Sequence, residues 1–230
     1  MIGIKEAAAL LTAKGRKEQN KFLAEGQKLI DEAIRSGYRQ CAVWKVEEVG
    51  GKAFSRLCDT KTPQGIVAAF EIPESKEKFF YKDKCYVLLE NLQNPGNAGS
   101  IIRTAEAMGA KGVIFCGEAV DIYSQKMLRG SMGSALRVPT FTFDTPALAK
   151  ESISKAGLEL WGSALTGKVS KLGTEKFSSG VIAVGNEGAG LSGELLNLCD
   201  KVVTIPMKGG TESLSAPAAA AILMWELFGK

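Results

Sequence analysis

The 230-residue sequence contains no histidine, and its five cysteines lie far apart with no CxxC pair. The lack of histidine removes the commonest general base and every Ser-His or Cys-His nucleophile. With only isolated cysteines, a zinc site or a disulfide framework is disfavoured, so we expect no metal and interpret the cysteines as buried thiols. They are Cys41, Cys58, Cys85, Cys116 and Cys199.

Long hydrophobic runs are also absent. No apolar run approaches the roughly 20 residues that a bilayer span needs. The segment "MIGIKEAAALLTAKGRKEQ" has charges where a signal peptide needs an unbroken apolar region. We therefore expect a cytoplasmic protein without membrane contact. The composition, 45% hydrophobic and 23% charged, is that of a globular chain able to bury a core.

Charge is distributed unevenly along the chain. Residues 1–82 contain 15 Lys and Arg against 11 Asp and Glu, whereas residues 83–230 contain 14 of each kind. The first third includes a small basic cluster, Lys14, Arg16, Lys17 and Lys21, which is suited to phosphate contacts. The alternative interpretation is an ordinary solvated helix surface, because a surplus this small does not identify a nucleic-acid partner.

The first third is predicted to be a compact α/β unit. The stretch "KFLAEGQKLIDEAIRSGYRQCAVWKV" indicates a short strand, an amphipathic helix ended by Gly37, and a second strand, and "IVAAFEIP" indicates a third. The apolar face of the helix contains Leu29, Ile30, Ala33 and Ile34. The charged segment "ESKEKFFYKDK" follows Pro73, so we place a linker near residues 74–82.

The second part alternates apolar runs with helical or loop segments. The runs are "CYVLLEN", "KGVIFCG", "LELWGSAL", "GVIAVGN" and "KVVTIPM". Continuous apolar strands of this kind predict a mostly parallel sheet covered on both faces. In such sheets ligands bind beyond the carboxyl ends of the strands. Three loops in that position are rich in glycine or hydroxyl residues: "NLQNPGNAGS", "GNEGAGLS" and "MKGGTESLS".

Glycine-rich loops of this kind raise the possibility of dinucleotide binding. The first loop offers only Gly96 and Gly99, and "GNEGAG" has its glycines in the wrong order for GxGxxG. Glu118 or Asp121 would have to serve as the acidic partner of the ribose. A nucleotide-dependent oxidoreductase therefore remains the weaker alternative.

Three stretches, in this order and spacing, closely resemble the motifs of the SpoU/TrmH family of RNA ribose methyltransferases, within the SPOUT superfamily. They are "ENLQNPGNAGSIIRTAEAMGA", "VIAVGNEGAGLS" and "IPMKGGTESLS". In addition, "KMLRGSMGSALRVP" resembles the family's RxSxG segment leading into a strand. The stretches "FLAEG" and "TPQGIVAAF" resemble the small N-terminal substrate-binding domain of many members.

The resemblance implies a SPOUT-type α/β fold with a mostly parallel sheet and a C-terminal deep trefoil knot, a rare exception to the rule against knotted chains. A small α/β RNA-binding domain at residues 1–80 would precede a knotted methyltransferase domain at 83–230. The family binds S-adenosylmethionine in a bent form inside the knot. Motif matching assigns Gly185 to close backbone approach, and Ile205 and Leu214 to main-chain contacts and apolar walls around the base.

The implied methyl acceptor is a ribose 2'-hydroxyl of RNA, a poor nucleophile that must be positioned and whose developing alkoxide must be stabilised. The matching polar positions are Asn97, Arg103, Glu187 and Ser213. The family's arginine is often described as the general base. Because a guanidinium stays protonated, we expect Arg103 instead to position a phosphate or to stabilise the alkoxide. Asn97 has a plainer alternative as a turn residue or helix cap.

The third motif departs from the family, which usually has Ser-Leu-Asn where this chain has Ser213, Leu214 and Ser215. Ser215 can cap the last helix, but it lacks the two-sided reach of an amide. A catalytically weak RNA-binding paralogue is therefore a second alternative. The resemblance further implies a homodimer joined through the knotted domain. It favours ribosomal RNA over transfer RNA as the partner, because the front domain resembles those of members that modify ribosomal RNA.

Overall fold

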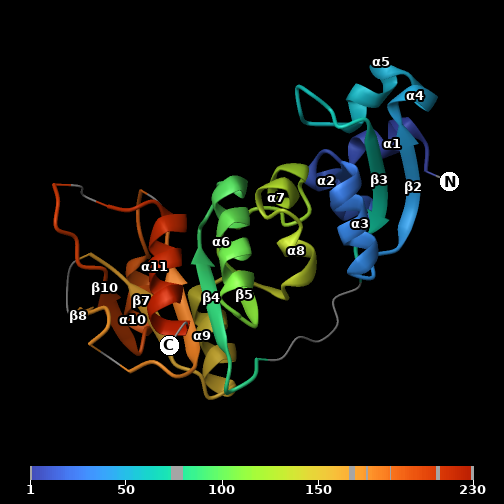
Figure 1. The fold of residues 1–230 in the computed structure, drawn as a ribbon. Coiled ribbons are helices and arrows are strands. Elements are labelled where there is room, and N and C mark those ends of the chain that lie inside the picture. Colours follow the sequence, from blue (N-terminus) through green and yellow to red (C-terminus); the bar gives the residue numbers. More distant parts are fainter. Residues whose placement is uncertain are drawn as a thin grey trace. The chain divides into compact units, whose positions relative to one another are not determined.

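The structure, a computed structural model, describes residues 2–73, 80–165, 169–174, 176–186, 188–210 and 213–228. The chain divides into two compact units (Figure 1). The first unit contains Met1–Lys76 and Asp121–Arg137, and the second contains Glu77–Val120 and Val138–Lys230. The chain therefore passes from one unit to the other three times.

The second unit is built on a seven-stranded sheet with the strand order β6-β5-β4-β9-β7-β10-β8. Every pair of neighbouring strands is parallel. Strands β5 and β9 are buried along their whole length, which confirms the parallel sheet predicted from continuous apolar runs. The strands are β4 (Cys85–Glu90), β5 (Gly112–Cys116), β6 (Thr140–Phe143), β7 (Leu160–Ser163), β8 (Ser170–Lys171), β9 (Gly180–Val184) and β10 (Lys201–Thr204).

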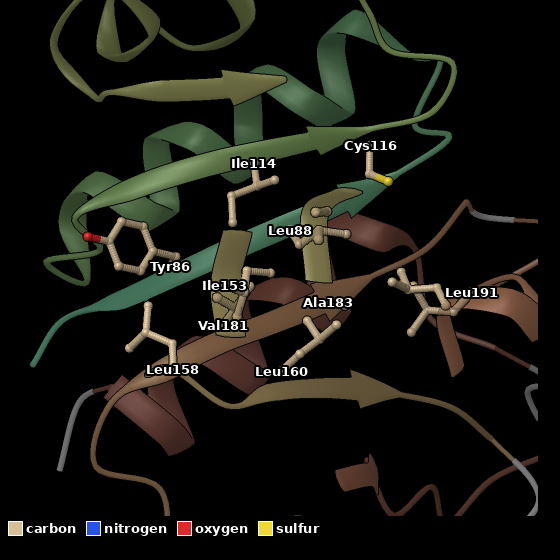
Figure 2. Close-up of a cluster of buried hydrophobic side chains, with 12 residues drawn as sticks. Tyr86, Leu88, Ile114, Cys116, Ile153, Leu158, Leu160, Val181, Ala183 and Leu191 are labelled. Carbon is tan, nitrogen blue, oxygen red and sulfur yellow. The ribbon is translucent and has the colours of Figure 1, made fainter. Parts of the chain in front are cut away.

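Helices cover both faces of this sheet. On one face, α9 (Pro146–Lys155) and α10 (Gly193–Leu198) pack through Ile153 and Leu195 into a core with Leu88 and Val181 (Figure 2). Because side chains alternate along a strand, the other buried positions of β4 point to the opposite face. There α6 (Pro95–Ala107) and α11 (Ala216–Phe228) lie side by side (Figure 1).

Local sequence explains where α6 begins and ends. The Asn94 side chain accepts hydrogen bonds from the backbone N–H groups of Gly96 (2.9 Å) and Asn97 (3.4 Å), and Pro95 takes the first helical position. Gly109, at φ 75°, follows the C-terminal residue and stops the helix, as predicted. Asn94 is thus the helix cap, and Asn97 lies inside the first turn.

The first unit contains a three-stranded antiparallel sheet with the order β1-β3-β2. One face packs against a cluster that includes Leu10, Phe54 and Leu57 from the surrounding helices. The elements are α1 (Ile4–Ala9), α2 (Ala13–Gln19), β1 (Lys21–Glu25), α3 (Gln27–Arg35), β2 (Gln40–Lys45), α4 (Val46–Val49), α5 (Gly51–Phe54), a 3-10 turn at Ser55–Leu57 and β3 (Ile66–Glu71).

The segment Asp121–Arg137 joins β5 to β6 of the second unit but packs within the first. It contains α7 (Gln125–Gly130) and α8 (Ser134–Arg137). The ring of Tyr123 lies 5.0 Å from that of Phe22, and the Gln125 amide donates to the Leu57 carbonyl at 2.9 Å. The sequence-based division at residues 74–82 places this segment in the methyltransferase domain, whereas its contacts are made in the first unit.

Two expectations about individual residues of the first unit need correction. Ile34 was assigned to the apolar face of α3, but it is 51% exposed, and only Ile30 and Ala33 are buried there. The three-stranded sheet offers a narrow apolar surface, so it covers a narrower stripe of α3 than the four-residue face expected from the sequence. Arg16, assigned to a phosphate-binding cluster, is buried and forms an ion pair with Asp121 at 2.7 Å.

In the part of the chain that the structure describes, no helix combines the length and apolar character that crossing a bilayer would require. Among the same residues, no three His, Cys, Asp or Glu side chains gather as a possible metal site.

Candidate functional site

A cavity of about 350 Å³ opens in the second unit at the carboxyl ends of three adjacent strands, β9, β7 and β10. Parallel strands of an open α/β sheet commonly bind ligands at this edge. The lining begins with the last residues of β7 and β9, Ser163 and Val184, and continues into the loops that follow. The start of α11 closes the cavity through Ala216 and Ala219.

Four of the residues singled out from the sequence line this cavity: Gly185, Ile205, Ser213 and Leu214. All three residues assigned to cofactor contact are thus brought together from segments up to 29 positions apart in the sequence. Ile205 and Leu214 are half-buried, so each presents apolar surface to the cavity, and Ser213 is exposed.

The other predicted residues that the structure describes do not line the cavity. Among the described residues, the lining includes neither Asn97 nor Arg103, which belong to α6, nor Ser215. The Ser215 carbonyl accepts a hydrogen bond from the Ala219 N–H at 3.0 Å, so its backbone opens α11. Glu187 lies outside the described residues.

Arg103 occupies the exposed side of α6. Its neighbours Ile101 and Ile102 are fully buried, so the helix is anchored while the guanidinium points away from the core. No hydrogen bond or ion pair to another described residue engages the Arg103 side chain in the described part of the chain.

Gly185 is needed for the close approach of two backbone segments. A Cβ atom at this position would lie 2.1 Å from the backbone carbon of Gly190 and 2.4 Å from the Leu191 nitrogen. Backbone atoms cannot yield as a flexible side chain can, so any larger residue would push the loop out of place. The glycine thus shapes the cavity wall, which refines the expectation that it admits the ligand directly.

Asn186 holds the same loop in its turn. Its side-chain oxygen accepts from the Gly188 N–H at 2.9 Å, and its amide donates to the Asn91 carbonyl at 3.2 Å. The Asn91 side chain, in turn, accepts from the Glu118 N–H at 2.9 Å. Neither asparagine was singled out from the sequence. Asn91 comes one residue after β4 and Asn186 two residues after β9, and this position at the functional edge of the sheet is the signal that points to them.

Glu90, the last residue of β4, was also not singled out. Its carboxylate is buried and accepts from the Ser192 N–H at 2.7 Å and the Ser192 hydroxyl at 2.6 Å. Ser192 caps α10 by accepting from the Leu195 N–H at 3.1 Å. A charged residue ending a fully apolar strand is unusual, and here it ties the glycine loop to the neighbouring strand.

No cysteine is among the described lining residues of this cavity. All five are free. Cys58 and Cys116 are buried, as expected, whereas Cys41, Cys85 and Cys199 are half-buried. Burial raises the pKa of the Cys116 thiol to about 11 and that of Cys199, whose α10 borders the cavity, to about 12. These thiols stay protonated near neutral pH and are poor nucleophiles.

The described lining residues of the cavity include no Lys, Arg, Asp or Glu. A dinucleotide would place a pyrophosphate here, and no described lining residue would supply a cation to neutralise it. Apolar side chains and exposed backbone groups instead suit an adenosine-like ligand without phosphate. Asp121, proposed as a ribose partner for a dinucleotide, is engaged by Arg16 in the first unit.

Comparison with known families identifies the chain. Residues 84–225 match the model of the SpoU rRNA Methylase family, and residues 3–50 match the MRM3-like substrate binding domain. The protein belongs to the SpoU family. This membership confirms the resemblance read from the three motifs, and it leaves the oxidoreductase alternative without support.

Relatives and solved structures of SpoU enzymes match nearly the whole chain. The 23S rRNA (guanosine(2553)-2'-O)-methyltransferase RlmP of Bacillus subtilis is 34% identical over 98% of this chain and 96% of its own length. The AdoMet-bound rRNA methyltransferase of Sinorhizobium meliloti is 30% identical, with a TM-score of 0.83 over 97% and 93% of the two chains. The SpoU methyltransferase AviRb of Streptomyces viridochromogenes, in complex with AdoMet, is 28% identical with a TM-score of 0.83, over 98% and 96%.

Proposed function

We propose that this protein methylates a ribose 2'-hydroxyl of ribosomal RNA with S-adenosylmethionine as the methyl donor. The cavity at the ends of β7, β9 and β10, whose described lining residues carry no charge, is the observation that carries the proposal. Relatives named for 2'-O-methylation of 23S ribosomal RNA and solved neighbours bound to AdoMet support it. The cytoplasm, where ribosomal RNA is found, is the compartment that we propose.

The donor would lie between Ile205 and Leu214, with its adenine against their apolar surfaces and its polar edges on loop backbone. Gly185 keeps the loop at the distance that this pocket requires. When bound, S-adenosylmethionine supplies an electrophilic methyl group. We further propose the knotted path of the family for the tail, since Leu214 and the start of α11 meet the glycine loop around one cavity.

The polar residues would act on the RNA. Arg103 would place a backbone phosphate or stabilise the oxygen as its proton leaves, because its guanidinium remains protonated. Ser213, exposed at the cavity, would contact the ribose, and Glu187 would orient Arg103 or the loop. Asn97 would fix the loop before α6. Ser215 would help to set the entry of α11 into the site.

A homodimer would complete the site. Two apolar side chains of α11, Trp225 and Ile222, are 65% and 40% exposed and stand three residues apart on one helical face. Exposed apolar surface of this kind marks association sites. Because α11 lies beside α6, a second copy covering this face would bring its own cavity near Arg103, which does not line the cavity of its own chain.

The test is a comparison of ligands followed by a methyl-transfer assay. S-adenosylmethionine should raise the melting temperature of the protein, and NAD should not. Incubation with labelled donor and protein-free 23S ribosomal RNA should place the label on a ribose 2'-oxygen, which can be mapped by resistance to alkaline cleavage. RNA binding without label would instead identify a catalytically inert paralogue, and no response to the donor would refute the proposal.

A further inference from the structure

A second cavity lies wholly within the first unit. It has a volume of about 250 Å³ and is bounded by α3, by Gln64 in the turn before β3, and by α7. This volume is smaller than that of pockets for whole drug-sized ligands, which begin near roughly 300 Å³. Its walls come from two stretches of the chain, 25–64 and 128–132, so it exists only when Asp121–Arg137 is docked.

The base of this cavity is a fixed arrangement of charges. The carboxylate of Glu25 is buried and accepts hydrogen bonds from the Thr60 hydroxyl at 2.9 Å and the Gln64 N–H at 2.9 Å. Arg129 from α7 lies 3.7 Å from Glu25 and forms a closer ion pair with Asp59 at 2.6 Å. Because the Glu25 carboxylate already accepts hydrogen bonds from Thr60 and Gln64 and lies near Arg129, it organises the site rather than calling for a metal ion.

The apolar wall includes a strained residue. Met132 has φ 49°, a left-handed conformation that is costly for a side chain other than glycine, and it is nevertheless 49% exposed. The turn is locked by hydrogen bonds from the Met132 N–H to the Arg129 carbonyl (3.0 Å) and from the Gly133 N–H to the Leu128 carbonyl (3.1 Å). The strained backbone holds the Met132 side chain exposed to solvent, so this conformation contributes little to packing of the core. We therefore infer that Met132 has a role at the cavity.

Polar groups stand around the opening. The Gln64 side chain lies across Gly26, whose absent Cβ would fall 2.2 Å from the Gln64 oxygen, so the amide is kept at the cavity. A carboxamide offers a donor and an acceptor side by side, which matches the edge of a nucleobase. Lys28, in the first turn of α3, is an exposed lining cation suited to a phosphate.

We propose that this cavity receives one unstacked base of the RNA substrate. Leu29 and Met132 would contact the faces of the ring, Gln64 its edge, and Lys28 the adjoining phosphate. The inference rests on the proposed function, and it adds a recognition site in the first unit whose wall includes Met132 of the stretch that resembles the family's RxSxG segment. The helix α3 belongs to residues 3–50, which match a substrate-binding domain, and this favours RNA over another protein as the occupant.

The segment Asp121–Arg137 acquires a specific role in this proposal. It supplies Leu128, Arg129 and Met132 to the base site, while its two ends continue into β5 and β6 of the second unit. Arg129 is then a positioning residue: it touches Glu25 and Asp59 and sets the wall without needing to touch the RNA.

The test fills the cavity. Leu29→Trp should weaken binding of protein-free 23S ribosomal RNA by about tenfold, the loss expected when one base can no longer stack. Affinity for S-adenosylmethionine and the melting temperature should stay at wild-type values. Ile34→Trp is the matched control, since Ile34 is on the same helix, exposed and outside the cavity, and it should bind RNA normally.

A second variant guards against a local fold change in the first. Met132→Ala removes an exposed wall residue and should also weaken RNA binding, by about threefold to tenfold. Photo-crosslinking with 4-thiouridine-substituted RNA should label the peptide containing Leu128 and Met132 in the wild type and not in Leu29→Trp. Wild-type RNA affinity in both variants would overturn the proposal. RNA binding that depends on the cavity without any methyl transfer would leave this site standing and refute the enzymatic function instead.

Discussion

The two cavities of this protein are built on opposite principles. The cavity of the second unit has no charged residue among its described lining residues, and its shape comes from backbone segments that pass close to Gly185. The cavity of the first unit is bounded by four charged side chains: Glu25 and Arg129 pair with each other, Glu32 pairs with Arg137, and Lys28 is exposed. The cavity of the second unit thus suits a small, phosphate-free ligand through its shape. The cavity of the first unit suits a charged polymer through side chains that are already in place.

This contrast predicts where each unit is vulnerable. A site shaped by backbone should fail when a glycine gains a side chain and should tolerate changes of surface charge. A site shaped by ion pairs should fail when one member of a buried pair is removed. The following predictions test the contrast from the largest expected effect to the smallest.

Gly185→Ala should have the largest effect. Its new methyl group would overlap the backbone at Gly190, so the loop must move, and affinity for S-adenosylmethionine should fall by about 100-fold or more, measured by isothermal titration calorimetry. Gly188→Ala is the control, because a Cβ there would lie 3.6 Å from the nearest atom, an ordinary contact. Equal losses in the two variants would show that shape at Gly185 is not the cause.

Arg103→Ala should reduce turnover by about 100-fold while leaving donor affinity unchanged, because the lost group acts on the RNA and not on the donor. Single-turnover methyl transfer and calorimetry separate the two quantities. Lys155→Ala, which removes an exposed cation of α9, is the matched control and should keep full turnover. If Arg103→Ala keeps full turnover, Arg103 is not a catalytic residue.

Mixing Arg103→Ala with Gly185→Ala tests whether the arginine serves the partner's cavity. After subunit exchange, each mixed dimer would hold one intact site, so about a quarter of wild-type activity should return if half of the dimers are mixed. If the arginine serves its own chain, no mixed dimer would contain an intact site. Sedimentation of the wild type and of Trp225→Glu would establish in parallel whether α11 joins the dimer.

Arg16→Met should destabilise the first unit by about 2 kcal/mol, since the Asp121 carboxylate loses a buried partner but keeps partial access to water. Hydrogen exchange should accelerate in β1 and in Asp121–Arg137 and not in β4 or β9. Lys14→Met, at an exposed pair with Glu18, should change stability by no more than about 0.5 kcal/mol. An unchanged exchange rate in Asp121–Arg137 would mean that the ion pair does not hold the segment.

Ser215→Asn should have the smallest effect. An amide restores the donor and acceptor that a hydroxyl only partly supplies, so turnover should rise by roughly twofold to tenfold with unchanged donor affinity. The rate of methyl transfer under saturating donor measures this gain. A slower enzyme would indicate that the serine is adapted to the short side chains at the start of α11.

The sequence predicts the second unit well and the first only in part. Continuous apolar runs are a local property, so β4, β5, β7, β9 and β10 were located, and three motifs placed the cofactor residues beside one cavity. The docking of Asp121–Arg137 depends on partners such as Arg16, 105 positions away in the chain, which no periodicity reveals. The same is true of the cavity in the first unit, whose walls come from distant stretches.

The sequence also could not predict which side chains are buried and which are exposed. Leu29, Ile30, Ala33 and Ile34 have the same apolar character in the sequence, yet only Ile30 and Ala33 are buried. Likewise, Lys14 and Arg16 are equivalent cations by composition, and only their surroundings distinguish a solvated lysine from a buried arginine. Burial of this kind depends on tertiary contacts and not on residue type.

The segment Asp121–Arg137 joins strands of the second unit but packs within the first, and this arrangement limits how such proteins can change during evolution. The front unit cannot be exchanged as a cassette ending near Pro73, because Phe22 and Arg16 would lose the partners that the later stretch supplies. A descendant that evolves to recognise a different RNA substrate must therefore change both the N-terminal stretch and the segment Asp121–Arg137 together. Chimaeras between relatives should therefore fold only when both stretches are inherited from the same parent.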